Sequence, residues 1–301
     1  MRATALLAAS LAPCAGAHAL ETVFDISAGP RVDELHWSIA GNSQGMNPNI
    51  LSELTWRSVD SLQLGVNLEL TSDTGFTLQT RASFGQIYDG TVRDSDYSGH
   101  NRTGECSRSE GETNDDDVMD FSLAIGKKIP VTNSRSTFVT PMAGFSFHEE
   151  DFRVTDGYQV IGSPGPIAGL DSRYKAEWWS TFLGVQVDHY GSQWDTFGRV
   201  EYHNVDYEAE GDWNLRSDLA HPVSFKHKSD GSGPVYTVGT RYRFNSNWAF
   251  NASFSWANWD SDSGTDRTFF SNGSVTTTRL NTAQWENNAL MLGVSYLSDG
   301  N

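Results

Sequence analysis

The sequence predicts an all-β protein, a transmembrane antiparallel up-and-down β-barrel of about ten strands with short periplasmic turns and long extracellular loops. Three observations predict it. Several segments alternate apolar and polar residues with a period of two, which is the period of a strand. The connections between these segments alternate in length. The chain is also polar on average, with a mean hydropathy of −0.46, yet it holds 10 Trp, 10 Tyr and 16 Phe. A polar lumen and aromatic bands at two membrane interfaces account for both values.

The first residues have the features of a secretory signal peptide. One arginine precedes a largely apolar run, and the tripeptide AHA at 17–19 supplies a small-x-small cleavage site. We therefore expect a signal peptide over 1–19 and an outer-membrane barrel domain over 20–301. Cys14 offers an alternative as a lipoprotein anchor, but Pro13 directly before it fits that signal poorly.

The strands follow from alternation and length. Residues 62–70 read LQLGVNLEL, with five apolar side chains on one face and Gln, Gly, Asn and Glu on the other. Residues 235–244 and 248–257 alternate in the same way. Many segments exceed the 9–11 residues that cross a bilayer. The expected strands lie near residues 22–40, 49–71, 75–90, 116–129, 136–158, 173–190, 194–211, 223–244, 247–262 and 277–298.

The connections separate a membrane barrel from a soluble β-sandwich, which shares the alternation. Short connections are expected at 71–75, 131–134, 191–193 and 245–247, and long ones at 41–49, 89–115, 157–172, 211–222 and 260–276. Strict alternation of short and long places every long loop at one end, as in the outer membrane of a Gram-negative bacterium. A sandwich has no reason to keep its long loops together.

Charge and cysteine content exclude several classes of protein. The net charge of −17 argues against nucleic-acid binding. Only Cys106 remains after processing, so no disulfide within the chain is expected. The acidic run at 114–117 could alternatively bind calcium, but it lacks the spaced ligands of a known calcium loop. We expect no metal ion and no organic cofactor.

One motif suggests water activation. GTVRDSDY at 90–97 is expected in the second long loop, and the fourth long loop lies four strands away around a ring of ten, across the mouth. That fourth loop offers Asp212, Asp218 and His221. A carboxylate pair can share a proton, while a histidine or aspartate facing it orients or deprotonates water.

These segments resemble the omptins, a family of ten-stranded outer-membrane endopeptidases. FDISAG at 24–29 and SELTW at 52–56 are similar to the openings of the first two omptin strands. GTVRDSDY resembles the family's motif of a glycine, three residues, Asp-x-Asp and an aromatic. The resemblance implies that Asp94 and Asp96 occupy the places of the catalytic aspartate pair.

The resemblance is incomplete at the second half of the omptin site. The family's Asp-x-His dyad falls on Asp212 and Asn214, and asparagine has no basic nitrogen. Two histidines are candidate substitutes for the missing base, His221 in the fourth long loop and His100, which follows the aspartate pair by four residues. Glu210 matches an acidic position that receives a basic substrate side chain, and Glu34 matches a second such position across a gap.

The functional expectation is therefore divided. The resemblance implies a surface endopeptidase that uses an aspartate pair to activate water and cuts at basic residues, with lipopolysaccharide as an activating lipid. Its partners would be outer-membrane lipid, basic peptides or proteins, and host surface molecules. The alternative is a catalytically degenerate barrel that serves as an adhesin, a receptor or a structural protein. A pore is the third reading, which a lumen filled by side chains disfavours.

Overall fold

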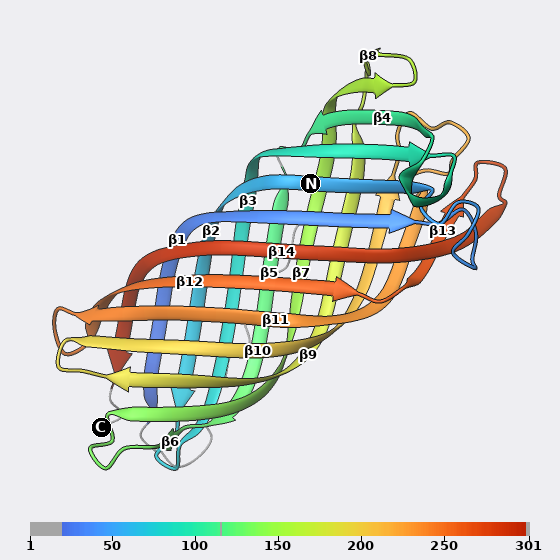
Figure 1. The fold of residues 1–301 in the computed structure, drawn as a ribbon. Helices are drawn as coiled ribbons and strands as arrows, with labels where there is room; N and C mark the ends of the chain where they lie inside the picture. The colour runs from blue at the N-terminus through green and yellow to red at the C-terminus, as the bar shows by residue number, and fades with distance from the viewer. Residues whose placement is uncertain (1–19, 115, 299–301) are drawn as a thin grey trace.

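The computed structural model describes residues 20–114 and 116–298 and shows a closed barrel (Figure 1). The predicted signal peptide over 1–19 and Cys14 lie outside the described residues. No helix in the described part of the chain is both long and apolar enough to cross a membrane.

The wall of the barrel consists of ten main strands. The ring order is β1, β2, β3, β5, β7, β9, β10, β11, β12 and β14, and β14 pairs with β1 to close it. All pairings are antiparallel, as predicted. The short strands β4, β6, β8 and β13 pair with the ends of these main strands. The bounds are β1 Glu21–Ile39, β2 Ser52–Thr71, β3 Phe76–Tyr97, β4 Glu105–Glu112, β5 Asp117–Lys127, β6 Ile129–Pro130, β7 Thr137–Ile161, β8 Gly165–Pro166, β9 Ser172–Tyr190, β10 Trp194–Asp212, β11 Phe225–Arg243, β12 Trp248–Ser261, β13 Gly264–Phe269 and β14 Val275–Ser298.

The two ends of the barrel differ as the alternating connections predict. One end, the short-turn end, carries the short connections, with β6 in the β5–β7 connection. β1 begins at this end and β14 ends at it, since Thr22 pairs with Ser298. The opposite end, the long-loop end, carries β4, β8 and β13 (Figure 1).

Part of the predicted second long loop is a strand. β3 continues to Tyr97, and β4 pairs with its last residues, so Asp94 and Asp96 lie in a hairpin of sheet. The predicted strand ended near residue 90 because the apolar side of the alternation ends there, while the alternation itself continues in polar residues. The predicted end of this strand near residue 90 is therefore wrong, because the strand continues through the aspartate pair to Tyr97. β13 likewise occupies part of the predicted fifth long loop.

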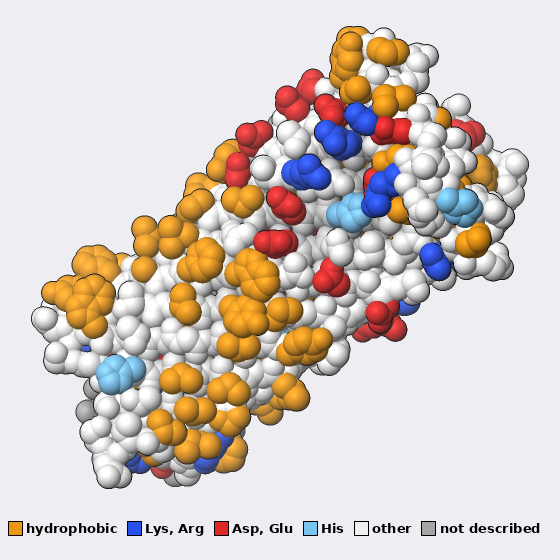
Figure 2. Space-filling model, in the orientation of Figure 1, with side chains coloured by type: hydrophobic (Ala, Val, Ile, Leu, Met, Phe, Trp, Pro, Cys, Tyr) orange, Lys and Arg blue, Asp and Glu red, His pale blue; other side chains and the backbone are white. Residues whose placement is uncertain are grey.

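An apolar belt surrounds the half of the barrel nearer the short-turn end. Figure 2 shows hydrophobic side chains gathered over this half, with acidic and basic side chains toward the other end. Such a band matches the hydrocarbon core of a bilayer, and tryptophan and tyrosine favour its edges. The exposed belt residues include Leu62, Leu64, Val66, Phe76, Phe84, Ile125, Leu183, Val185, Trp194, Val200, Val238, Trp248, Phe250, Leu292 and Tyr296.

The interior has a polar lower part and an aromatic upper part. In the belt region, buried ion pairs cross the lumen, such as Arg81–Glu201 at 2.6 Å and Arg241–Asp25 at 2.9 Å. Above them lies an aromatic layer, which we define as Trp37, Trp56, Phe152, Tyr174, Trp178, Tyr207, Phe225, Trp259 and Trp285. The aromatic layer borders a lumen cavity of about 240 Å³ through Trp259 and Trp285, and a mouth cavity of about 510 Å³ through Trp37 and Phe225.

Candidate functional site

The mouth cavity, at the long-loop end, contains the predicted aspartate pair. β3 contributes Asp94 and Asp96 to its wall, and the connection between β10 and β11 contributes Arg216. Most of the remaining wall is apolar, from side chains that include Trp37, Leu54, Val92, Val154, Leu170, Trp213 and Phe225.

The two carboxyls repel each other in a dry environment. Because residues two apart on a strand share a face, Asp94 and Asp96 point to the same side. Burial raises the pKa of Asp94 to about 8, and the negative charge of Asp96 adds to that rise, against the opposing effects of Ser52 and Arg216. Burial also raises the pKa of Asp96. Asp94 therefore keeps its proton at neutral pH.

The proton on Asp94 predicts a pH-dependent stability. A carboxyl whose folded pKa lies above its usual 3.8 binds protons more tightly in the folded chain, so wild-type stability falls as the pH rises from about 4 to about 8. We expect Asp94→Asn to remove much of this fall, so that the variant becomes progressively more stable than wild type across that range. Urea unfolding in detergent at a series of pH values measures it. The exposed control Asp206→Asn should follow wild type, and an identical pH dependence in Asp94→Asn would contradict the assignment.

Asp212 and His221 form a hydrogen-bonded pair at the rim of the barrel. His221 Nδ1 lies 2.5 Å from Asp212 Oδ1, and this hydrogen bond raises the pKa of His221. Both side chains are partly exposed, and neither lines the mouth cavity. The structure thus forms a histidine–aspartate dyad at the rim, next to Arg216, whose backbone also interacts with His221.

Asn214, which stands where the omptin pattern has a histidine, makes structural hydrogen bonds between two loops. Its side-chain amide donates to the Gly169 carbonyl at 2.7 Å and accepts from the Asp171 backbone amide at 3.0 Å and the Ser172 hydroxyl at 3.1 Å. These bonds tie the β10–β11 connection to the segment that precedes β9. The side chain is therefore engaged in holding two loops together.

Glu210 and Glu34 lie on the outside of the barrel. Glu210 is exposed on β10 and forms an ion pair with Lys226 of β11. Glu34 is exposed on β1, in an outer groove that also holds Arg57 and Arg93. The strand alternation sends both side chains outward, so they do not line the mouth cavity as a substrate pocket requires.

The sequence analysis missed four ionisable residues of the mouth cavity, Glu110, Arg216, His227 and Asp266, of which the last two interact. His227 of β11 and Asp266 of β13 both line it, with His227 Nε2 3.5 Å from Asp266 Oδ1. His227 Nδ1 lies 2.9 Å from the Tyr174 hydroxyl. A signal was present, because His227 stands between Lys226 and Lys228, and two outward lysines on a strand place the residue between them inside.

Comparison with known proteins assigns the chain to a family. The family model described as "Pom: Protochlamydia outer membrane protein" matches residues 25–297. The chain belongs to this family. It is therefore an outer-membrane β-barrel protein. No curated protein sequence is significantly similar to it.

Solved structures confirm the omptin resemblance at the level of the fold. The crystal structure of the outer membrane protease OmpT from Escherichia coli superposes with a TM-score of 0.76 and 13% sequence identity, covering 92% of this chain and 97% of that chain. OprG from Pseudomonas aeruginosa reaches a TM-score of 0.38 at 11% identity, covering 94% and 98%. The translocator domain of NalP from Neisseria meningitidis reaches 0.37 at 11% identity, covering 94% and 89%. The match to OmpT shows that the chain shares its fold.

Proposed function

We propose that this barrel exposes its long loops at the cell surface and binds basic side chains of peptides or proteins in the mouth cavity without cleaving them. The charge of the cavity carries the proposal. Its described lining residues include the carboxyl groups of Asp94, Asp96, Glu110 and Asp266 and one guanidinium, that of Arg216. Asp94 keeps its proton at neutral pH and Glu110 pairs with Arg93, so Asp96 and Asp266 supply the unpaired negative charge. An acidic cavity attracts a cation.

The walls suit the rest of a basic side chain. Arginine and lysine carry apolar stems that pack on apolar surfaces while the charged end reaches a polar partner. Trp37, Leu54 and Phe225 provide such a surface beside Asp94 and Asp96. Arg216 lies close enough to act on the pKa of both carboxyls, which supports the compatibility of a guanidinium with this place. The Arg216 guanidinium donates two hydrogen bonds, of 2.9 and 2.8 Å, to Asp218. Because Arg216 is bound to Asp218, the guanidinium of a ligand can take the place beside Asp94 and Asp96.

Cleavage would require a base within reach of a water at the aspartate pair. Asn214 is not basic, and its amide is engaged by the loop before β9. His221 lies with Asp212 outside the mouth cavity. His227 is inside the cavity wall, but its ring contacts Tyr174 and Asp266 on its two nitrogen sides. These positions favour binding over hydrolysis.

The proposal includes a lipid partner on the outer wall. The groove that contains Glu34 also contains Arg57, Arg93, Arg102 and Arg108. Arg93, Arg102 and Arg108 pair with Glu110, Glu53 and Glu105, so a phosphate would compete with these carboxylates for them. If the long loops face outward, these arginines reach the level of lipopolysaccharide phosphates. Host surface molecules with basic segments are the corresponding protein partners.

A binding experiment tests the proposal. A fluorescent peptide that contains arginine is titrated against the detergent-solubilised barrel, beside the same peptide with the neutral isostere citrulline. We expect Asp94→Asn and Asp96→Asn each to weaken binding of the arginine peptide by roughly 10–100-fold, because a hydrogen bond to a charged group contributes about 1.5–3 kcal/mol. Asp206→Asn, an exposed carboxylate on the outer wall, is the matched control. Equal binding of the citrulline peptide would overturn the proposal.

An endopeptidase is the second candidate, favoured by the 2.5 Å contact between His221 and Asp212. It requires the β10–β11 connection to move His221 over the aspartate pair. Cutting of the arginine peptide by wild type, and its loss in both Asp94→Asn and His221→Ala, would support this function. A silent wild type that gains cleavage through Asn214→His would instead identify a protease scaffold without its base.

A further inference from the structure

A second cluster of ionisable groups lies inside the barrel, beneath the aromatic layer. β1 contributes Asp33, and β7 contributes His148 and Glu150. One ligand atom from each of the three side chains lies within 4.8 Å of the others. All three residues are buried, and none belongs to the mouth cavity.

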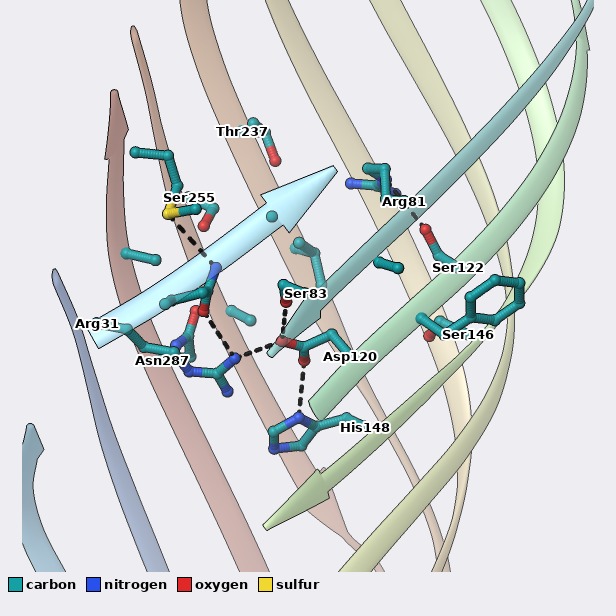
Figure 3. Close-up of a pocket in the computed structure, with 18 of the residues that line it drawn as sticks. Arg31, Arg81, Ser83, Asp120, Ser122, Ser146, His148, Thr237, Ser255 and Asn287 are labelled. Atoms are coloured by element: carbon teal, nitrogen blue, oxygen red, sulfur yellow. Dashed lines mark hydrogen bonds and ion pairs between the residues drawn. The ribbon is translucent and has the colours of Figure 1, made fainter. Parts of the chain in front are cut away.

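The histidine is oriented by a carboxylate on its far side. His148 Nδ1 lies 2.8 Å from Asp120 Oδ1, and Figure 3 shows Asp120 between Arg31 and His148. His148 Nε2 has no hydrogen-bond partner among the described residues and lies 3.9 Å from Glu150 Oε2. A carboxylate that fixes one nitrogen and leaves the other free is the arrangement of a metal-binding histidine.

Glu150 is the least satisfied group of the cluster. Its side chain is 0% exposed, and neither carboxylate oxygen has a hydrogen-bond partner in the part of the chain that the structure describes. A buried carboxylate without a partner is costly, so such groups are normally hydrogen-bonded or bound to a cation. Its free oxygens and the free nitrogen of His148 are adjacent.

The cluster holds more carboxyl groups than guanidiniums, which suits a bound cation. Asp33, Asp120 and Glu150 supply three carboxylates, whereas Arg31 supplies one guanidinium, which pairs with both Asp33 and Asp120. A metal ion binds the neutral form of His148, and with that form the cluster carries two uncompensated negative charges, which one divalent ion balances. Asp33 Oδ2 accepts only the 2.6 Å bond from Arg31 Nε among the described residues, so a lone pair remains for a metal.

We propose that Asp33, His148 and Glu150 bind one divalent transition-metal ion inside the barrel. An imidazole nitrogen together with carboxylate oxygens suits zinc and its neighbours, whereas calcium prefers oxygen ligands alone. The ion would link β1 to β7 across the lumen and neutralise Glu150. Its role is structural, and it is independent of peptide binding in the mouth cavity.

The test measures metal binding by the intact barrel. Barrel without an affinity tag is stripped with a chelator and titrated with Co²⁺, whose absorption bands report nitrogen and oxygen ligation, and with Zn²⁺ in competition. We expect one equivalent to bind, and Ca²⁺ not to compete. His148→Gln and Glu150→Gln should each weaken Co²⁺ binding more than 100-fold. Asp120→Asn, which leaves all three proposed ligands in place but alters the group that orients His148, should weaken it roughly 10–100-fold.

Two controls separate this site from other histidines. His203 is also buried in the lumen, with Nε2 3.6 Å from Glu201, but the described residues offer no third metal ligand beside it. His203→Gln should therefore leave Co²⁺ binding intact, as should His221→Ala at the exposed rim. The proposal fails if wild type binds no stoichiometric Co²⁺, or if a folded His148→Gln or Asp120→Asn variant binds it as wild type does. The folding of each variant is checked by the heat-dependent gel mobility that is typical of barrels. If the ligand variants do not fold, the Co²⁺ binding of Asp120→Asn is the result that tests the proposal.

Discussion

Replacing Trp56 with alanine is expected to lower the free energy of unfolding by about 3–5 kcal/mol, the range for a large aromatic removed from a core. Trp56 is 0% exposed at the centre of the aromatic layer. Its ring stacks on Phe152 at 5.1 Å between centroids and on Tyr174 at 5.0 Å. These contacts join β2 to β7 and β9, which are not neighbours of β2 in the ring. Alanine would leave a cavity that a closed sheet cannot collapse to fill.

Equilibrium unfolding in urea, followed by gel mobility in detergent or lipid vesicles, measures this loss. Trp56→Phe should lose much less, because it retains a stacking ring. Trp194→Ala, at an exposed side chain of the belt, should also lose less. If Trp56→Ala costs no more than Trp194→Ala, the aromatic layer is not the core of this barrel.

Replacing Glu201 with glutamine is expected to lower the free energy of unfolding by about 3–5 kcal/mol, because removing one partner of a buried ion pair leaves the other uncompensated. Glu201 is 1% exposed, and its carboxylate lies 2.6 Å from Arg81 and 3.8 Å from Arg199. Glutamine keeps the shape but not the charge, so Arg81 would lose its paired carboxylate and Arg199 one of its acidic neighbours.

The matched control is Glu208→Gln on the same strand. Glu208 pairs with Lys228 on the exposed outer face of β10 and β11, where water screens the interaction and little change in stability is expected. Comparable losses from Glu201→Gln and Glu208→Gln would show that burial does not decide the contribution of these carboxylates.

The fold was predictable because the membrane imposes a simple pattern on the lower barrel. Where outward side chains meet lipid and inward ones meet a polar lumen, as at Leu62 and Gln63, alternation can be read directly from the sequence. Above the belt both faces meet water or protein, and the contrast is lost. The continuation of β3 through Asp94 was missed for this reason, as was β13.

The site was predictable only in part. The local motif located Asp94 and Asp96, and strand alternation then sent both inward. The same alternation sends Glu210 outward, where an ungapped match to a family pattern had suggested an inward role. Other features depend on contacts between distant segments, such as the bonds from Asn214 to the loop before β9. No linear spacing in the sequence signals the pairing of Asp33 with Glu150.

The most direct test of binding without cleavage is mass spectrometry of a basic peptide after prolonged incubation with the barrel at neutral pH. The peptide should contain paired arginines, and the bound fraction is separated from the free fraction before analysis. The proposed function predicts that the bound peptide is recovered intact from wild type and is absent from the bound fraction of Asp94→Asn. Fragments cut between the arginines in wild type, but not in Asp94→Asn, would contradict it and establish an endopeptidase.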